Sequence, residues 1–594
     1  MRLSVAALGL LCVCAAAAGI LAHQVAQVQS ELEQTVSLVP QLRADLGGEN
    51  YEGAQQTFDQ MQHRIAAAQT TVTGPLWKAA SAFPIAGRNF SAVSEVVVSA
   101  DDIGSRAVAP LLGQYESLGV KGLTPIDGKI DVEQLQEATP TISTAANTVK
   151  LSYERIASID RSKLMPQIAE PIRSATEQLQ EVSDVLDDVS SAARLLPAML
   201  GANDPRDYLL LVQNNAEARA TGGIPGALVT LHTDNGLITM GNQSSASALG
   251  AFTPPLAVDP EQEALYTARL GAQMQNVNLT PDFPTAAFTA KRMWEQRHNG
   301  QSIDGVIALD PIVLSHLLEA TGPVVLTDPE VIDLIRETSL PKSLTTENVV
   351  STLLSDVYGQ IEDPATQDAY FAAVAGQVFA AFTNGQGDGG QLMKALATSV
   401  QEGRLYLWSA QSDEQDIVAS TALAGSVAGV DGGGSAIGVY FNDGTGAKMD
   451  YYAKRTVQLQ QTCRSDGYSN YTVRLNISNT APLDAASTLP PYVTGDGVFG
   501  VDPGRIRTNY VVYGPAQAFV EAATVDGAPV PIGSGRHGQR PVGTVALELG
   551  PGQTAEMDIL FSRVVQDDIS RLDVTPGLEE PEKMVLPTEQ SGCG

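Results

Sequence analysis

One stretch of the sequence, Tyr208 to Met240, constrains the fold more than any other. Residues 208–212 form a short, continuous apolar run, which is typical of a strand covered on both faces in a parallel or mixed sheet. The polar run Gln213 to Gly223 follows directly and predicts a loop at the carboxyl end of this strand, where ligands bind in open α/β sheets. Two further apolar runs flank Asn235-Gly236, which favours a tight hairpin because both residues tolerate positive φ.

This stretch and several later motifs resemble a known family. The motifs are Asp207-Tyr208-Leu209-Leu210-Leu211, Gln213 to Gly223, Asp282-Phe283-Pro284, Ile303 to Asp310, Thr321-Gly322-Pro323 and Lys448-Met449-Asp450-Tyr451-Tyr452. Together they resemble the bacterial envelope family catalogued as domain of unknown function 4012. The resemblance implies an envelope protein, and the family has no established activity to transfer.

A more distant likeness concerns the order of the elements. A strand, an arginine-bearing loop, a hairpin, a helix and the segment Ile303 to Leu318 follow one another as in the LytR-CpsA-Psr family, which transfers glycan chains from polyprenyl-phosphate carriers to the cell wall. That resemblance implies a transferase or pyrophosphatase in which Arg219 neutralises phosphate charge and Asp282 holds Mg²⁺. Thr221 stands where that family has an aspartate, and Gly241 to Ser244 stand where it has Pro-Arg-Asp. These differences favour a binding protein, and they leave open whether the chain is an enzyme.

Composition limits the compartment and the partners. A chain of 594 residues is too long for one hydrophobic core, so three or more structural regions are expected. Its formal net charge of -31 argues against nucleic acid as a partner, because neutralising phosphates needs clustered Lys and Arg. Cys12 and Cys14 lie in the hydrophobic leader, which leaves Cys463 and Cys593 as a candidate disulfide in an oxidising compartment.

The N-terminal leader predicts an attachment to the membrane. Leu3 to Ala22 contains no charged residue and is about 20 residues long, the length that crosses the hydrocarbon core as a helix. Arg2 precedes it, which places the N-terminus in the cytoplasm and the bulk of the chain outside, as a single-pass membrane protein. A cleaved signal peptide is the alternative, because Ala16-Ala17-Ala18 offers a small-residue cleavage site.

We expect a multidomain α+β chain with four regions: a transmembrane signal-anchor over 1–23, a helical stalk or bundle over 24–202, a central α/β three-layer domain over 203–429 and an antiparallel β-sandwich over 430–594.

A 3-4 apolar repeat predicts a coiled-coil or bundle seam through Ile172, Ala175, Leu179, Val182, Leu186, Val189, Ala193 and Leu196. Self-association through this helical region is its functional alternative. Gly432-Gly433-Gly434-Ser435 predicts a linker before the sandwich. Tyr471, Val473, Leu475 and Ile477 alternate with polar residues, as in a half-buried strand.

The candidate ligand-binding residues are Asn214, Asn215, Arg219, Gly222, Gly223 and Asp282. A guanidinium beside glycine amides suits an anion, because the fork donates to oxygen pairs and glycine lets the backbone approach a ligand closely. The structural alternative pairs Arg219 with Glu217 or Asp207, uses the glycines to shape the turn and makes Asp282 the N-cap of a helix. No zinc spacing, phosphate loop or nucleophile elbow occurs, so no metal or other cofactor is predicted outside the transferase alternative.

These patterns predict a membrane-anchored, extracytoplasmic cell-envelope protein. Its expected role is to bind or organise an anionic wall component or a glycan. The alternative is a glycan transferase or pyrophosphatase that acts on polyprenyl-phosphate-linked substrates.

Overall fold

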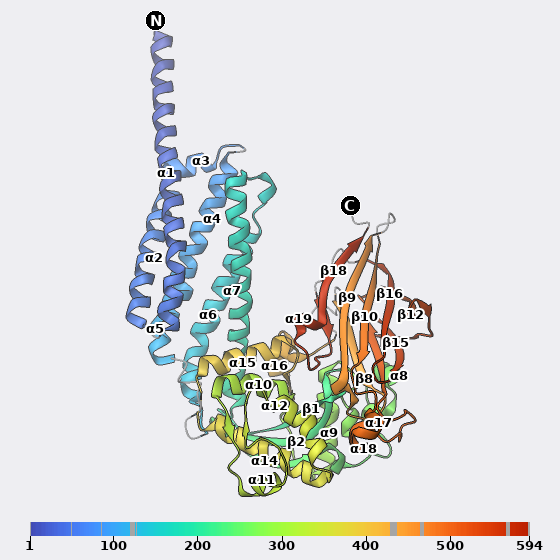
Figure 1. Cartoon of the computed structure of the whole chain (residues 1–594). Coiled ribbons are helices and arrows are strands. Elements are labelled where there is room, and N and C mark those ends of the chain that lie inside the picture. The colour runs from blue at the N-terminus through green and yellow to red at the C-terminus, as the bar shows by residue number, and fades with distance from the viewer. Residues whose placement is uncertain are drawn as a thin grey trace. The chain divides into compact units, whose positions relative to one another are not determined.

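The computed structural model describes residues 2–48, 50–84, 86–118, 125, 128–385, 387–427, 436–463, 468–565, 569 and 571–591. It divides into two compact units, Met1–Gly122 with Asp131–Ala198 and Leu123–Ile130 with Met199–Gly594. The first unit is helical and the second contains several sheets (Figure 1). The predicted α+β multidomain class with a helical N-terminus is therefore confirmed.

The first unit consists of helices that bury narrow apolar stripes against one another. Trp77 is almost fully buried, packs edge-on against Phe90 at 5.0 Å between ring centroids and donates its indole N–H to Ser94 Oγ at 3.0 Å. The elements are α1 Arg2–Gly47, α2 Tyr51–Val72, α3 Pro75–Ser81, α4 Gly87–Ile103, a π-helical turn Gly104–Val108, α5 Ala109–Leu118, α6 Val132–Ala157, a 3₁₀ turn Arg161–Lys163 and α7 Pro166–Met199.

The predicted membrane span lies within α1. Most side chains of this span, those of residues 3–16 and 18, fall outside the part of the chain whose side chains are described. Among the residues that are described, no helix is both long enough and apolar enough to cross a membrane.

The seam predicted along α7 is only partly buried. Ile172 and Ala193 are buried, whereas Val182 and Val189 remain 41% and 39% exposed. A straight α-helix has 3.6 residues per turn, so a strict seven-residue repeat drifts around its surface unless the helices supercoil. The continuous buried seam expected from the sequence is therefore wrong for the middle of α7.

The second unit is built on a mixed five-stranded sheet in the order β3-β2-β1-β4-β7. β1 runs parallel to β4, and the other neighbours are antiparallel. Asn235 and Gly236 both have positive φ and join β2 to β3, as the hairpin prediction requires. The strands are β1 Arg206–Arg219, β2 Gly222–Asp234, β3 Leu237–Ser245, β4 Gly305–Leu309 and β7 Tyr406–Ser409, with a separate pair β5 Val324–Val325 and β6 Ser343–Leu344.

Four helices of this unit, α8, α10, α11 and α14, begin with the same pair, aspartate then proline. The aspartate side chain accepts from backbone N–H groups of the first turn, and proline suits the first helical position because its missing N–H has no partner there. The helices are α8 Pro260–Tyr266, α9 Phe283–Arg297, α10 Pro311–Thr321, α11 Pro329–Leu334, α12 Val349–Ser351, α13 Val357–Gln360, α14 Pro364–Thr383, α15 Gly389–Gln401 and α16 Ser412–Ala419. α9 packs against the sheet through the apolar core that contains Leu209, Leu211 and Trp294.

The loop predicted from Gln213 to Gly223 is wrong. The backbone continues as β1 to Arg219, and β2 begins at Gly222. The register between the two strands shifts between Asn214 and Ala218, so the polar residues form a bulge within a long hairpin. They remain in a strand because their buried side chains find partners inside the protein, which a sequence pattern cannot indicate.

Two facing sheets form the C-terminal part of the second unit and share one apolar core. Tyr471, Val473, Leu475 and Ile477 are all buried in it, as their alternation predicts. One sheet has the order β13-β12-β16-β10-β9-β18 and the other β14-β15-β11-β8-β17. The strands are β8 Ala436–Asp443, β9 Ala453–Cys463, β10 Ser469–Asn479, β11 Ile506–Tyr513, β12 Phe519–Val525, β13 Ala528–Pro529, β14 Gly533–His537, β15 Arg540–Leu549, β16 Thr554–Val564, β17 Arg571–Val574 and β18 Val585–Ser591; the short helices are α17 Ala485–Thr488, α18 Pro491–Thr494 and α19 Pro581–Met584.

The sandwich is not wholly antiparallel as expected. The edge strands β17 and β18 run parallel to β8 and β9. Both come from the last part of the chain, which returns over the sheets after β16 and adds one strand to an edge of each. The predicted linker 432–435 lies outside the described residues.

The predicted Cys463–Cys593 disulfide also lies outside the residues whose side chains are described. The described strands nonetheless bring its neighbours together. In the parallel β18–β9 pair Ser591 is the register partner of Thr462. Thr462 precedes Cys463, and Ser591 is two residues before Cys593.

We expect this disulfide to form in protein secreted into an oxidising compartment. Peptide mapping without reductant should recover one linked peptide with Cys463 and Cys593, and closure of so long a loop should stabilise the fold by about 4 to 5 kcal/mol in the chain-entropy model. A Cys12→Ser, Cys14→Ser variant is the control, since it leaves only these two thiols. Alkylation of both residues in the folded, unreduced chain would contradict the pairing.

Candidate ligand-binding site

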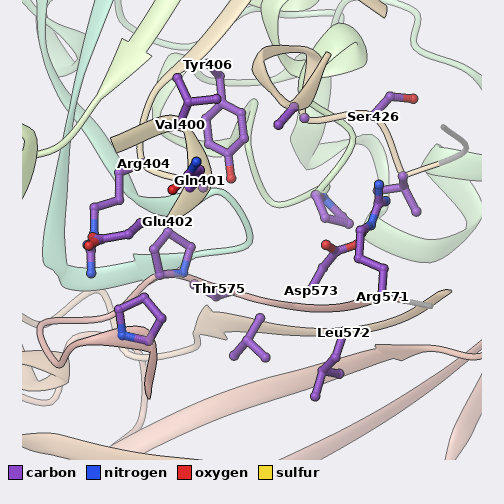
Figure 2. Close-up of a pocket in the computed structure, with 18 of the residues that line it drawn as sticks. Val400, Gln401, Glu402, Arg404, Tyr406, Ser426, Arg571, Leu572, Asp573 and Thr575 are labelled. Atoms are coloured by element: carbon purple, nitrogen blue, oxygen red, sulfur yellow. The ribbon is translucent and has the colours of Figure 1, made fainter. Parts of the chain in front are cut away.

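A cavity of about 530 Å³ lies within the second unit, between the central sheet and the sandwich. Its wall is formed by the end of α15, by β7 and by the 3₁₀ turn Ala422–Ala424 on one side, and by β8, β17 and the segment around α19 on the other. Figure 2 shows Glu402, Arg404 and Tyr406 on one side of the opening and Arg571 and Asp573 on another. This volume is in the range of about 300 to 1,000 Å³ that small-molecule sites occupy.

Arg404 is the buried cation of the first side. Its Nη1 donates to Asp310 Oδ2 at 2.9 Å and its Nε donates to Glu402 Oε2 at 2.6 Å. A third, longer bond of 3.4 Å runs from Nη2 to the carbonyl of Glu579. Although burial opposes its charge, the two carboxylates raise the pKa of Arg404 above its ordinary value. Arg404 therefore stays charged and joins β7 to the C-terminal tail.

Arg571 and Asp573 form the ionic pair of the second side. Both side chains project from β17, and Arg571 Nε donates to Asp573 Oδ2 at 2.9 Å. Burial raises the pKa of the Asp573 carboxyl, even though Arg571 and Arg540 lie near it. The Arg571 side chain is 50% exposed and the Asp573 side chain 31% exposed, so both are open to a ligand in the cavity.

Tyr406 supplies an aromatic surface and a hydroxyl. Its ring stacks on the ring of Phe283, with 5.2 Å between the ring centroids. This contact holds the Tyr406 side chain of β7 against the first residue of α9. Burial raises its pKa, as do the charges of Asp573 and Asp310, so the phenol stays protonated at neutral pH. Among the described residues no group forms a hydrogen bond with this hydroxyl.

The wall behind the cavity is held by Arg540. This side chain is 1% exposed and donates to four backbone carbonyls, those of Val427, Ala436, Gly514 and Tyr513. Val427 and Ala436 both line the cavity. A guanidinium has five donors in a rigid plane, so one buried arginine is able to fix several strands at once.

Arg219 lies outside this cavity, in a buried ionic pair. Its Nη2 is 3.1 Å from Glu217 Oε1 and its Nη1 donates to the carbonyl of Ala218 at 2.9 Å. The side chain is 7% exposed. This is the arrangement that the structural alternative predicts for Arg219.

The Arg219 pair is part of a larger buried ionic cluster, which comprises Glu217, Arg219, Asp443, Lys448, Asp450 and Arg455. Lys448 Nζ lies 3.6 Å from Glu217 Oε2 and 4.9 Å from the ring centroids of both Tyr358 and Tyr492. Asp450 pairs with Arg455 and accepts a bond of 3.0 Å from the backbone N–H of Ala218. The buried ionic cluster therefore ties the end of β1 to the sandwich.

Asp443 is the carboxylate of this cluster with the most perturbed proton affinity. Burial raises its pKa to about 7, and the nearby charges of Asp450 and Glu217 act in the same direction. Arg219 and the hydrogen bonds from Thr445 oppose the shift without cancelling it. Asp443 therefore changes its charge near neutral pH.

The glycine pair shapes the end of the β1–β2 hairpin. Gly222 has a φ of 131°, which L side chains rarely adopt. A Cβ on Gly223 would lie 2.2 Å from the carbonyl carbon of Asn214, so no larger residue fits there. Both glycines are explained by the backbone geometry of the hairpin.

The two predicted asparagines bind groups on either side of β1. Asn214 donates to the hydroxyl of Tyr358. Asn215 donates to Asp310 Oδ2 at 2.9 Å, the oxygen that Arg404 also contacts. Asn215 also donates to the carbonyl of Pro576, a residue of the cavity wall, at 3.5 Å.

Asp282 is the N-cap of α9. Its Oδ2 accepts from the backbone N–H of Thr285 at 3.3 Å and from the Thr285 hydroxyl at 2.6 Å, and its Oδ1 accepts from the N–H of Val427 at 3.3 Å. No contact among the described residues joins Asp282 to Arg219. The structure therefore brings Arg219, Gly222 and Gly223 together at one hairpin end and leaves Asp282 at the start of a helix.

The principal cavity residues were not identified from the sequence as site residues. Nothing in the local sequence showed that Arg404 would meet Asp310, 94 residues earlier. The alternation of charged and apolar residues in 571–574 was the available signal for β17. Within the described residues there is no group of three or more His, Cys, Asp or Glu side chains able to hold a metal ion.

Residues 203–358 match the family described as Protein of unknown function (DUF4012). The resemblance predicted from the sequence is thereby confirmed for this segment. Comparison with curated proteins finds no match for the chain. The matched segment contains Arg219 and Asp310, whereas Arg404, Arg571 and Asp573 lie beyond it.

Replacing Arg219 should destabilise the second unit. Arg219→Ala leaves Glu217 buried with one partner fewer, and breaking a buried ion pair costs about 3 to 5 kcal/mol. Calorimetry should show a lower Tm for this unit. Arg336→Ala is the matched control, because it removes an exposed arginine beside Asp333 and should cost less than about 1 kcal/mol. Equal Tm values for the two variants would refute the structural role of Arg219.

Stability of the second unit should depend on the protonation of Asp443. Its pKa in the folded chain is raised to about 7, so its contribution is full below about pH 4, the ordinary pKa of an aspartate, and is lost as the pH rises through 7. Asp443→Asn removes the titrating group, although it also replaces one of the two oxygens that accept from the backbone N–H groups of Thr445 and Gly446. As the pH rises from 5 to 8, we expect the stability of the variant relative to the wild type to increase, by at most roughly 4 kcal/mol in unfolding free energy. Parallel Tm profiles of the two proteins over this range would contradict the assignment.

Proposed function

We propose that this chain is a membrane-anchored, extracytoplasmic cell-envelope protein that binds a glycan or another wall component without transforming it. The uncharged leader from Leu3 to Ala22 supports the anchor. The register that brings Ser591 beside Thr462 supports the disulfide and with it an oxidising compartment. Residues 203–358 match the DUF4012 family, and the envelope location that the sequence resemblance to this family implies agrees with the proposal.

The observation that carries the proposal is the cavity between the central sheet and the sandwich. It is large enough for a small ligand, and its lining combines apolar residues such as Val400 and Pro576 with the ionic groups of Arg571 and Asp573. Sites for small molecules have this composition, in which apolar walls supply contact area and a few polar groups fix orientation. Because Arg404 and Arg540 fix the wall, the site is formed before any ligand binds.

A binding role is favoured over catalysis because a triad-like arrangement among the described residues lacks an accessible nucleophile. His316 Nδ1 lies 3.1 Å from Ser399 Oγ, and His316 Nε2 lies 3.8 Å from Glu402 Oε1. Ser399 is 0% exposed, however, and donates its proton to the carbonyl of Ala395 at 2.7 Å. A nucleophile has to reach its substrate, so these residues support a structural network.

The alternative remains a transferase or pyrophosphatase on polyprenyl-phosphate-linked substrates, within a three-layer fold similar to the LytR-CpsA-Psr family. It needs Arg219 and Asp282 at one phosphate. Arg219 is instead paired with Glu217, and Asp282 caps α9, so each side chain binds a group of the protein rather than a phosphate or a metal ion. The geometry therefore supports binding in the cavity better than catalysis at the hairpin.

Purified full-length protein in detergent should bind soluble oligosaccharides released from bacterial cell walls. Saturation-transfer NMR detects which sugars contact the protein. Ala422→Trp places a large side chain at an exposed position of the cavity wall and should abolish the signal without lowering the Tm. Ala528→Trp, exposed on β13 and outside the cavity, is the matched control and should bind as the wild type does.

Two results would count against the proposal. The first is the absence of any bound sugar with the wild-type protein. The second is equal signals from Ala422→Trp and the wild type, which would place the binding elsewhere.

A further inference from the structure

The charges that line the cavity are balanced within the protein. Arg404 is paired with Asp310 and Glu402 at 2.9 Å and 2.6 Å, and Arg571 is paired with Asp573 at 2.9 Å. Each arginine of the cavity wall thus already has a carboxylate partner. Binding a polyanion there would require it to compete with these carboxylates.

A further ion pair leaves the charges of the wall balanced. Glu579 lines the cavity and lies 3.5 Å from Lys454. The cations are Arg404, Arg571, Lys454 and Arg540, which lies near Asp573 behind the wall. The carboxylates are Asp310, Glu402, Asp573 and Glu579. With all groups ionised the two sets are equal in number. The formal net charge of -31 adds repulsion of anions at long range.

The same wall retains unused capacity for hydrogen bonds. The Tyr406 hydroxyl has no partner among the described residues. In the part of the chain that the structure describes, Arg571 donates only through Nε and Asp573 accepts only from Arg571. The outer N–H groups of Arg571 and the second oxygen of Asp573 are therefore a donor and acceptor set on one side of the cavity, and the Tyr406 phenol on another side both donates and accepts.

Neighbouring hydroxyl groups match such a set. Each hydroxyl donates one hydrogen bond and accepts two, so adjacent hydroxyls can accept from a guanidinium and donate to a carboxylate. Leu572 and Val574 alternate with Arg571 and Asp573 along β17 and pack against the sandwich core, so the apolar contacts of the cavity come from other lining residues such as Val400 and Pro576. A sugar ring has both features, since its hydroxyls point outward around carbon–hydrogen surfaces.

We propose that the cavity binds an uncharged, polyhydroxylated ligand, a neutral segment of an envelope glycan, through the Tyr406 hydroxyl and the Arg571–Asp573 pair. This inference rests on the proposed function and narrows its ligand. It excludes phosphate-rich and carboxylate-rich wall polymers from this site.

The test separates neutral from anionic ligands. Oligosaccharides released from bacterial cell walls are divided by anion-exchange chromatography into neutral and anionic fractions, and each is offered to full-length protein at equal sugar concentration. We expect saturation transfer to the neutral fraction alone. The apparent affinity should change less than twofold between 50 and 500 mM salt, because screening weakens only interactions between charges.

Point variants test the proposed contacts. Tyr406→Phe removes a hydroxyl that has no protein partner, so affinity should fall roughly three- to tenfold with an unchanged Tm. Tyr513→Phe removes the same atom outside the cavity, where it contacts Tyr266 at 2.9 Å, and should leave affinity unchanged. Asp573→Asn should weaken binding while leaving its salt dependence small.

Each contrary outcome has a definite meaning. Binding of the anionic fraction alone, or a loss of affinity of tenfold or more at high salt, overturns the neutral ligand and leaves the proposed binding function standing. Equal affinity of Tyr406→Phe and the wild type for neutral sugar overturns the assigned contacts. No signal from either fraction overturns the proposed function, and the inference falls with it.

Discussion

The second unit depends on the ionic partners of Glu217, a side chain at the end of β1 that is buried together with Arg219 and Lys448. A buried charge that loses its partner costs several kcal/mol, so this end of β1 stays bound to the sandwich. Asp450 completes the attachment by accepting from the backbone N–H of Ala218. The central sheet and the sandwich therefore form one compact unit, although their strands belong to separate sheets.

The cavity is a consequence of that attachment. Ala220, the residue after Arg219, lines it, and the carbonyl of Ala220 accepts a bond of 2.9 Å from Thr575 Oγ1. Thr575 follows β17 and accepts in turn from the backbone N–H of Phe441. The hairpin end, β8 and β17 are thus fixed against one another on one side of the cavity. A preformed wall lowers the entropy lost when a ligand binds.

Whether a charged side chain of this protein is structural or faces a ligand site depends on where its partners lie. Arg219 beside two glycines suggested an anion site, but Glu217 lies two residues away and neutralises the guanidinium. Arg404 and Asp573 carried no motif, yet both lie on the wall of the cavity. An arginine–carboxylate pair that faces a cavity keeps hydrogen-bonding capacity with little net charge, and for this reason the wall suits hydroxyl groups better than phosphates.

The sequence by itself determined the features that depend on near neighbours. The hairpin at Asn235-Gly236, the cap at Asp282 and the buried face of β10 each follow from a few adjacent residues, whose φ preferences, side-chain oxygens and alternation act locally. Tertiary structure alone decided that the polar residues from Gln213 to Arg219 continue β1 and that Arg404 meets Asp310. Burial and long-range pairing set those outcomes, because a polar side chain is equally compatible with solvent and with a distant partner until the fold supplies one.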